Sequence, residues 1–234
     1  MGIARVTEAN ARLFGVPLGP WREQVYLSSL RDPAKVRPAA TRLARRLERG
    51  RSVRIRHPNG TDLTLGLLGR KATVSVGEVT PETQRNAFGS MASVPDENVY
   101  VAVDEGTAEG TFVSNRPNTT NFDRPLEGGR LTFRDGRLVR STFARGGSEF
   151  RSAYRAAGAG RERPSFLEIG LDPTVRGAPM LEESELGAVT VGVGRNAGFG
   201  GKTKVDFLGY LTLAGAQLTI DGTAVLRGGR LGGR

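Results

Sequence analysis

The residues best placed to do chemistry lie in one stretch, residues 187–206, which reads GAVTVGVGRNAGFGGKTKVD. Alternating valines at 189–193 predict a buried strand, and a second strand is expected over residues 204–211. The glycine-rich segment between them is expected to be a loop held by a sheet. Because loops on a rigid sheet commonly carry binding and catalytic groups, this stretch is the first candidate for a functional site.

The loop also has a partial likeness to a phosphate-binding loop. Residues 196–203 read NAGFGGKT, but Asn196 stands where that motif begins with glycine. The segment after Thr203 is expected to be a strand, so no helix amino terminus would complete a phosphate cradle. We therefore expect no nucleotide site here.

The supply of nucleophiles and metal ligands is small. The chain has no cysteine, which excludes disulfides, thiolate nucleophiles and cysteine-ligated zinc, and it has one histidine. His57 begins an HPNG segment between expected strands at 52–56 and 61–65, and Asn-Gly is a strong hairpin signal. We interpret His57 as a surface residue of this turn, with half of an acid/base pair as the alternative. A site with several histidines is excluded.

The remaining elements must position this stretch, and the sequence pattern changes near residue 50. Apolar residues at helical spacing predict helices over 5–14, 21–30 and 37–48, the last ended by Gly50. After Gly50, alternating patterns predict strands at 52–56, 61–65, 99–103, 110–113, 129–133 and 137–141, and residues 148–157 are expected to form a short helix. Segment 166–171 is apolar on both sides of one carboxylate, and a second hairpin is expected at 217–225. The predicted fold is α+β, with a helical amino-terminal segment at 1–50 and a strand-rich mixed sheet domain at 51–234.

Composition limits the possible partners. The net charge of +10 comes mostly from arginine, which a high-GC bacterial genome also enriches. The arginines are spread along the chain and the aromatic residues are not interleaved with them, so we expect no nucleic acid partner. The basic face of the third helix, formed by Arg42, Arg45, Arg46 and Arg49, is interpreted as a solvated face.

No run of 18 apolar residues occurs, and residues 1–5 lead into a charged helix instead of a signal sequence. We therefore expect a cytoplasmic protein with no membrane partner.

Eight segments in a fixed order carry a resemblance to a known family. They are TEANAR near the start, GTDLTL at 60–65, VPDENVY at 94–100, GRLTFRDGRLV at 129–139, LEIGL at 167–171, GAVTVGVG at 187–194, KVD at 204–206 and IDG at 220–222. Together they resemble the carboxy-terminal domain of the thermophilic metallo-aminopeptidases of the aminopeptidase T and aminopeptidase S type. The resemblance implies that the family's preceding α/β domain is absent from this chain, and that the protein is a homodimer.

The resemblance also implies a chemistry, in which two metal ions activate a water molecule to attack the peptide bond next to a free amino terminus. The family's metal ligands map onto this chain residue by residue. A glutamate falls on Asn98, a histidine on Thr190, and the histidine of an H-x-D pair on Lys204. Only Glu168 and Asp206 keep a ligating side chain, and the loop tyrosine of the family has no counterpart around residues 195–199. The resemblance therefore implies that most metal ligands are replaced, and we expect neither a metal nor another cofactor.

A lysine in place of a metal ligand suggests an ion-pair triad. We expect Lys204 to lie between Glu168 and Asp206, where its ammonium replaces the charge of the metal. The triad is either a catalytic or binding group, in which Lys204 acts as base or nucleophile, or a salt bridge that fills a defunct site. The candidate ligand-binding residues around it are Asn98, Tyr100, Thr190 and Arg195.

The sequence thus predicts an aminopeptidase-like protein with a dismantled two-metal site. It is expected to act as a metal-independent enzyme, or as a binder of a small molecule or short peptide, in the specialised metabolism of a high-GC bacterium. Two alternatives stay open: an active metallo-aminopeptidase with non-standard ligands, and a non-catalytic protein that binds a partner.

Overall fold

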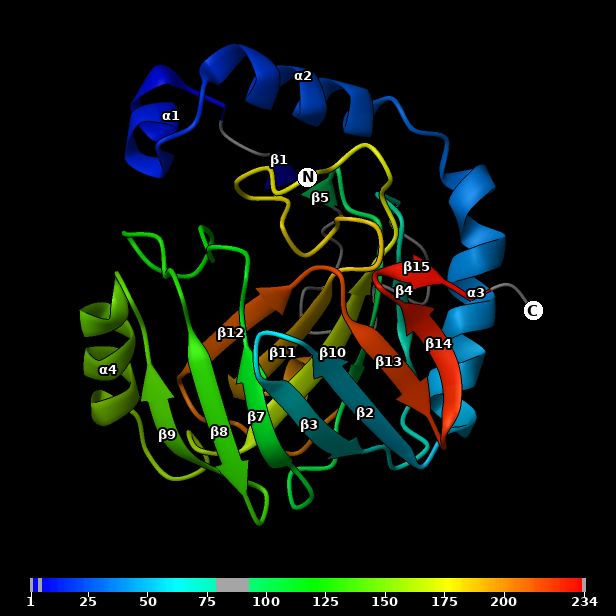
Figure 1. Ribbon diagram of the computed structural model, residues 1–234, viewed down its shortest axis with the longest axis vertical. Helices are drawn as coiled ribbons and strands as arrows, with labels where there is room; N and C mark the ends of the chain where they lie inside the picture. Colours follow the sequence, from blue (N-terminus) through cyan, green and yellow to red (C-terminus); the bar gives the residue numbers. More distant parts are fainter. Residues whose placement is uncertain (1, 4–5, 79–92, 233–234) are drawn as a thin grey trace.

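The computed structural model describes residues 2–3, 6–78 and 93–232. Residues 1, 4 and 5 lie outside this range, so the interpretation of residues 1–5 as the lead into a charged helix falls mostly outside the described residues. Figure 1 shows two sheets lying one over the other, with helices at the edges and above them. Within the described residues, no helix has the length and apolar character needed to cross a membrane.

Three helices open the chain, as predicted, and one lies in the middle: α1 (Glu8–Phe14), α2 (Leu18–Ser29), α3 (Pro33–Arg49) and α4 (Gly147–Ala156). Helix α3 begins earlier than its apolar spacing indicates, because the Asp32 side chain accepts a hydrogen bond from the Ala34 N–H at 3.0 Å and Pro33 occupies the first turn.

The larger sheet has eight strands in the order β15-β14-β13-β2-β3-β7-β8-β9. In chain order they are β2 (Ser52–His57), β3 (Thr61–Gly66), β7 (Glu109–Val113), β8 (Arg130–Arg134), β9 (Arg137–Thr142), β13 (Gln217–Ile220), β14 (Thr223–Arg227) and β15 (Arg230–Leu231). The β2–β3 hairpin forms as the Asn-Gly signal predicts, and His57 pairs with Thr61 at its end.

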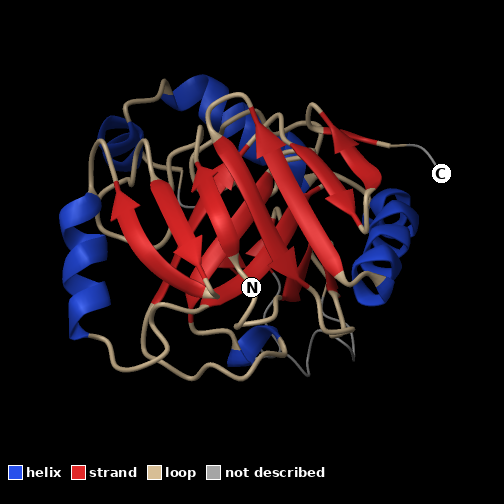
Figure 2. Ribbon diagram, turned by 60° about the horizontal axis from the view of Figure 1, so that its bottom comes forward, coloured by secondary structure: helices blue, strands red, loops and turns tan. Residues whose placement is uncertain are grey.

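The smaller sheet has five strands in the order β12-β11-β10-β6-β4. They are β4 (Thr73–Ser75), β6 (Asn98–Ala102), β10 (Pro164–Gly170), β11 (Val189–Gly194) and β12 (Leu208–Leu213). Two short strands, β1 (Gly2–Ile3) and β5 (Ser93–Val94), pair in parallel outside both sheets. Figure 2 shows the strands as the middle of the molecule, with helices around them.

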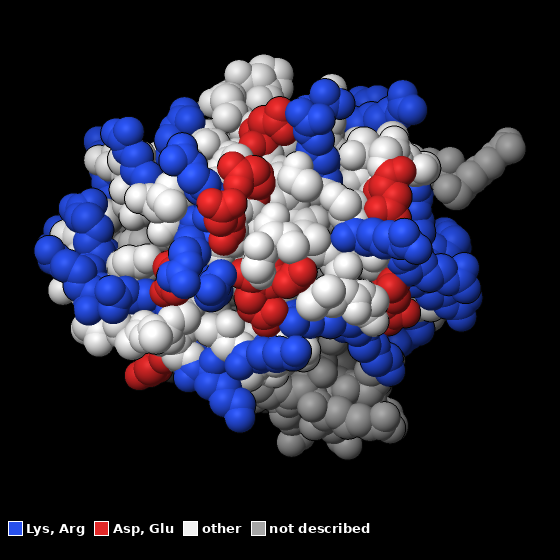
Figure 3. All heavy atoms as spheres, turned by 90° about the horizontal axis from the view of Figure 1, so that it is seen from below, with Lys and Arg blue, Asp and Glu red and all other residues white. Residues whose placement is uncertain are grey.

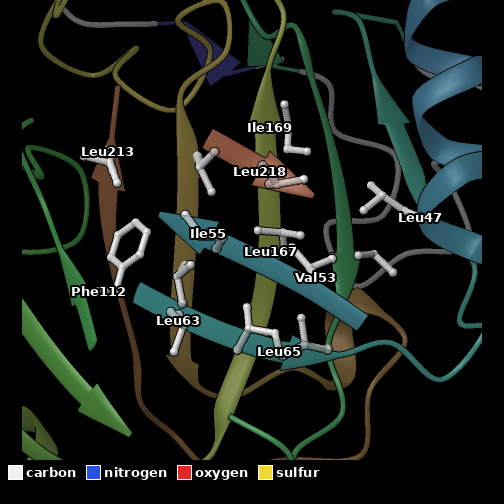
Figure 4. Packing of buried hydrophobic residues seen from close by; sticks show 14 of the residues in the cluster. Leu47, Val53, Ile55, Leu63, Leu65, Phe112, Leu167, Ile169, Leu213 and Leu218 are labelled. Carbon is white, nitrogen blue, oxygen red and sulfur yellow. The ribbon is translucent and has the colours of Figure 1, made fainter. Parts of the chain in front are cut away.

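The main core lies between the two sheets. Leu167 and Ile169 of β10 pack there against Val53 and Ile55 of β2, and all four side chains are fully buried (Figure 4). Helix α3 closes one edge of this core with Leu47. The described α+β architecture confirms the predicted fold class.

A second, smaller core lies under α1 and α2. Trp21 of α2 packs there against Val175, Ala178 and Leu181, and its indole N–H donates a hydrogen bond to the Pro179 carbonyl at 2.9 Å. The amino-terminal helices therefore divide: α3 joins the core between the sheets, whereas α1 and α2 pack on segment 171–186.

The second strand predicted for the glycine-rich stretch begins later than expected. Strand β12 starts at Leu208, and residues 201–207 form bends and irregular structure. The loop closes on itself before the strand, since the Arg195 N–H bonds to the Phe207 carbonyl at 2.7 Å and the Asn196 N–H bonds to the Thr203 carbonyl at 3.0 Å. Val205 and Phe207 are buried, so the residues that alternate with them face solvent.

Candidate functional site

One row of side chains crosses the five-stranded sheet on the face turned away from the main core. Tyr100 of β6 pairs with Glu168 of β10, Glu168 with Thr190 of β11, and Thr190 with Thr212 of β12. Directly opposed residues of an antiparallel pair project from the same face, so this row is polar. Strand β10 alternates, with Leu167 and Ile169 in the core and Glu168 on the polar face.

A cavity of about 840 Å³ lies over this polar face. Its size is within the range of about 300–1,000 Å³ usual for small-molecule sites. Strands of the sheet supply Asn98, Tyr100, Phe166 and Glu168, and the connections around it supply the other walls. Those walls include Asp96, Asn121, Phe122, Glu183, Arg195, Phe199 and Asp206.

Three carboxylates line the cavity: Glu168 is buried, and Asp96 and Glu183 are half-buried. Burial, with the charge of Glu183, raises the pKa of Asp96 to about 6, although hydrogen bonds from Ser75 and Asn98 lower it. Burial and the charges of Glu183 and Asp96 raise the pKa of Glu168 well above its usual value. Burial also raises the pKa of Glu183. The three groups repel each other, and none forms an ion pair with a lysine or arginine of the described chain.

Hydrogen bonds hold two of these carboxylates in place. Asp96 accepts from the Ser75 hydroxyl and from the Asn98 amide, both at 2.5 Å. Glu183 accepts from the Tyr210 hydroxyl at 3.0 Å. Burial and the neighbouring charge of Glu183 raise the pKa of Tyr210 well above its usual value, so the phenol stays protonated and can donate this bond.

Two hydrogen-bond acceptors at the cavity have no partner within the part of the chain that the structure describes. The Asn98 side-chain oxygen is buried and accepts no hydrogen bond there. The Glu168 carboxylate, with the residue only 8% exposed, likewise accepts none from the described residues. Buried acceptors are rarely left unsatisfied, so both point to a donor that enters the cavity.

Aromatic rings form another wall. Phe199 stacks on Phe166 with ring centroids 4.5 Å apart and meets Tyr100 edge to face at 5.5 Å. Phe166 in turn contacts Tyr210 at 5.9 Å. The cavity thus combines acidic groups with an apolar surface, which suits a ligand that has both a cationic and an apolar part.

The glycine-rich loop carries Phe199 to this wall and is anchored at its base. Phe199 ends a short 3₁₀ helix, η2 (Ala197–Phe199). The fully buried Asn196 amide donates to Glu105 at 2.8 Å, and its oxygen accepts from the Thr203 N–H at 2.8 Å. Glu105 is held in turn by two hydrogen bonds from Arg70, at 3.1 and 2.7 Å. Asn196, the departure from the phosphate-binding motif, therefore shapes the loop.

The structure brings together most of the residues that the sequence singles out. The cavity is lined by Glu168, Asn98, Tyr100, Arg195 and Asp206. Thr190 lies next to Glu168 in the sheet but is fully buried, and its hydroxyl shares a hydrogen bond with Thr212 at 2.9 Å.

The expected triad around Lys204 is wrong. Lys204 and Asp206 are both exposed, and Asp206 lies 3.8 Å from the Arg195 guanidinium at the rim. Among the described residues, Lys204 forms no ion pair with Glu168 or Asp206. The physical reason is the burial of Val205 and Phe207, which turns the alternating Lys204 and Asp206 towards solvent.

Sequence reasoning missed Asp96, Glu183, Tyr210 and Phe199. The acids lie in PDEN at 95–98 and in LEESE at 181–185, and such acid-rich runs were the available signal. Asp96 and Glu183 lie in connections outside the helices and strands. An alternating strand pattern therefore cannot predict that either side chain faces the cavity.

The donors present do not fit the two-metal site that the resemblance implies. No group of three or more His, Cys, Asp or Glu side chains in the described chain has an arrangement that holds a metal ion. The only histidine, His57, lies at the β2–β3 turn, where its Nδ1 accepts from the Asn59 N–H at 3.1 Å. Imidazole donors for a zinc-like pair are thus missing at the cavity.

Comparison with known proteins finds one matching family and several similar solved structures. The profile of a family described as thermophilic metalloprotease (M29) matches residues 34–160. A solved structure of 2,5-dihydroxypyridine dioxygenase from Pseudomonas putida KT2440 is similar with a TM-score of 0.71 and 19% identity, over 90% of this chain and 63% of that one. Wild-type AmpT from Thermus thermophilus is similar with a TM-score of 0.60 and 18% identity, over 92% of this chain and 55% of that one.

At these identities, the two structures show a shared fold alone. The chain spans less than two thirds of the length of either. No curated protein matches the sequence.

Proposed function

Since the chain belongs to the thermophilic metalloprotease (M29) family, we propose that it is an aminopeptidase-like protein with a dismantled two-metal site. Its cavity binds a small molecule or short peptide through a protonated amine. The observation that carries this proposal is the set of cavity carboxylates, buried Glu168 with half-buried Asp96 and Glu183, which form no ion pair with a cationic side chain of the described residues. The degenerate site, a homodimeric state and a role in bacterial specialised metabolism belong to the same proposal.

An ammonium group supplies what these residues lack. Buried carboxylates are costly to ionise unless a cation or hydrogen-bond donors offset the loss of water. An ammonium has three N–H donors, which matches the unpartnered Asn98 oxygen and the Glu168 carboxylate. The amine therefore enters at the polar face, next to β6 and β10.

The rest of the cavity suits the body of such a ligand. Phe166 and Phe199 offer an apolar wall, and Arg195 lies at the rim, where Asp206 is its one ion-pair partner among the described residues. A short peptide fits this arrangement, with its amino terminus at the carboxylates and a carboxylate within reach of Arg195. An amine without a carboxylate uses the inner part alone.

Calorimetric titration with pairs of ligands tests the proposal. Short peptides and simple aromatic amines are compared with their acetylated forms, which have lost the positive charge. We expect the free amines to bind at least about tenfold more tightly, which corresponds to about 1.4 kcal/mol. The Glu168→Gln variant should lose this preference, whereas Glu23→Gln, at an exposed position on α2, should keep it. Equal affinity for free and acetylated forms would contradict the proposal.

The pH dependence gives a second readout. Asp96 has a pKa of about 6 and Glu168 a raised pKa, so both take up protons in mild acid. A cationic ligand needs the ionised carboxylates, so its affinity should rise between about pH 5 and pH 7. Affinity that stays flat across this window would place the amine elsewhere.

Metal content separates this proposal from an active metallo-aminopeptidase with non-standard ligands. We expect the purified protein to contain no stoichiometric zinc, cobalt or manganese by elemental analysis. A chelator should leave its melting temperature unchanged. Two transition-metal ions per chain would favour the metallo-aminopeptidase.

The alternative of a partner-binding protein has one feature in its favour. Tyr26, Leu27 and Leu30, at the end of α2, are 61%, 46% and 63% exposed. Exposed apolar side chains that cluster on a surface commonly mark an interface. A homodimer would bury them, and light scattering that gives twice the 25.0 kDa chain mass would support that state.

A further inference from the structure

A second concave site lies between α3 and the β13–β14 turn, and it shares no lining residue with the acidic cavity. This groove has a volume of about 530 Å³ and is lined by Arg42, Arg45, Arg46, Arg49, Ile220 and Asp221, with Gly50 and Thr223. Figure 3 shows lysine and arginine gathered on the right-hand edge of the molecule, the side on which α3 lies in Figure 1. We call the side chains of Arg42, Arg45, Arg46 and Arg49 the arginine row.

The helix fixes the direction of the arginine row. Positions 42, 45, 46 and 49 are spaced i, i+3, i+4 and i+7, so they share one face of α3. The opposite face, with Ala40, Leu43 and Leu47, is buried in the main core. Because the helix cannot rotate without exposing that core, the row faces the groove over a length of about 10 Å.

The arginine row has no anionic partner in the described structure. None of its guanidinium groups forms an ion pair there, whereas Arg54, Arg70 and Arg116 each pair with a carboxylate at 2.7 Å. The one acid of the groove, Asp221, is engaged by the backbone N–H groups of Arg51 and Ser52 at 2.9–3.1 Å. Within the described structure, the Arg46 guanidinium donates a hydrogen bond to the Ala224 carbonyl at 3.3 Å, which holds Arg46 against the groove wall.

We propose that this groove binds a small molecule that carries two or more phosphate groups. A guanidinium presents paired N–H donors that match phosphate oxygens, and four of them along two helical turns can engage more than one phosphate. The groove lies within the volume range of small-molecule sites. None of its lining residues is aromatic, so it lacks the stacking surface that single-stranded nucleic acid uses. This site is independent of the acidic cavity and of the function proposed for it.

The arginine row also has a role that needs no ligand. Arg46 and Arg49 lie in the last turn of α3, where cations stabilise the negative end of the helix dipole. This stabilisation of the helix end does not involve Arg42, and it requires no bound ligand. Binding measurements therefore distinguish it from the proposed site.

Calorimetric titration with tripolyphosphate, at constant ionic strength, tests the proposal. We expect one molecule bound per chain, and affinity at least about tenfold lower in the double variant Arg45→Gln/Arg49→Gln. The matched control is Arg140→Gln/Arg155→Gln, which removes the same charge from exposed positions on β9 and α4. The control should bind as the parent does. Arg45→Lys/Arg49→Lys keeps the charge but loses the paired donors, and should also bind more weakly.

Several outcomes would overturn the proposal. Absence of tripolyphosphate binding would leave the row with its helix role only. Equal loss of affinity in the groove and control variants would show attraction to the net charge of +10. Tighter binding of a charge-matched oligonucleotide, lost in the groove variant, would assign the surface to nucleic acid instead.

Discussion

The two faces of the five-stranded sheet differ in what they contribute to the molecule, although neighbouring residues of one strand supply both. On one face, Leu167 and Ile169 are fully buried among the side chains of the other sheet. On the other, Glu168 is almost as deeply buried but faces Asp96 and Glu183 across a cavity. The first face stabilises the fold by apolar burial, and the second opposes folding by holding like charges together. The proposed binding of an amine gives a reason for keeping carboxylates at such a cost.

The largest effect on stability is expected for Leu167→Ala, which tests the apolar face of the sheet. The side chain is fully buried in the core between the sheets, so its truncation leaves a cavity and should lower the free energy of unfolding by about 2–5 kcal/mol. Chemical denaturation measures this loss. The matched control is Leu68→Ala, at a leucine that is 55% exposed, which should cost less than about 0.5 kcal/mol. Equal costs at the two positions would contradict the assignment of the core.

Glu105→Gln tests the anchor of the loop that covers the polar face. Although burial opposes it, hydrogen bonds from Arg70, the Lys202 N–H and Asn196 lower the pKa of Glu105 to about 2. Loss of the charge should destabilise the protein by about 1–3 kcal/mol, since buried Asn196 loses a charged acceptor.

The pH dependence of this effect has a defined sign. A lowered pKa stabilises the folded state fully above the usual value of 4.5 and loses that effect as the pH falls towards about 2. The difference between Glu105→Gln and the parent should therefore shrink in acid, as measured by thermal unfolding at several pH values. A difference that grows in acid would exclude an ionised Glu105 as the anchor.

Glu168→Gln should act in the opposite direction and stabilise the protein. A raised pKa means that ionised Glu168 destabilises the folded state at a pH above that pKa, so the neutral variant should be more stable than the parent at pH 8. A raised pKa favours the folded state relatively more in acid, and the penalty grows as the pH rises from the usual value of 4.5. The gain should vanish near pH 4. Destabilisation by Glu168→Gln at pH 8 would show a hidden partner for this carboxylate.

The smallest effect is expected for Lys204→Met. Because Lys204 is exposed and has no ion pair in the described structure, the variant should unfold within about 0.5 kcal/mol of the parent at every pH. A large, pH-dependent loss would restore the triad that the sequence predicts and place Lys204 on the polar face with Glu168.

The sequence predicts the fold well where local patterns repeat. Apolar residues at helical spacing identify α1 to α3, and the Asn-Gly turn identifies the β2–β3 hairpin. Alternation in segment 166–171 is hidden because β10 is buried on both faces, so Glu168 stands out only as a charge in an apolar run. Such a run indicates a central strand but not which residues face the cavity.

The site is predicted only in part, for a related reason. Asn98 and Tyr100 are found through segments that resemble the family, and both line the cavity. Asp96 and Glu183 lie in connections between strands. The path of such a connection depends on tertiary contacts, and no periodic sequence pattern predicts that path. The error at Lys204 follows from a strand that starts at Leu208, since a shift in where a strand begins changes which residues are turned inward.

The small core under α1 and α2 gives the protein an internal optical reporter. Trp21 is the only tryptophan of the chain, and its indole N–H bonds to Pro179, four residues before Glu183. Any ligand that draws the Glu183 segment towards the cavity changes the surroundings of this one indole. Its fluorescence emission can thus follow occupancy of the acidic cavity without an attached dye, through a residue that does not line it.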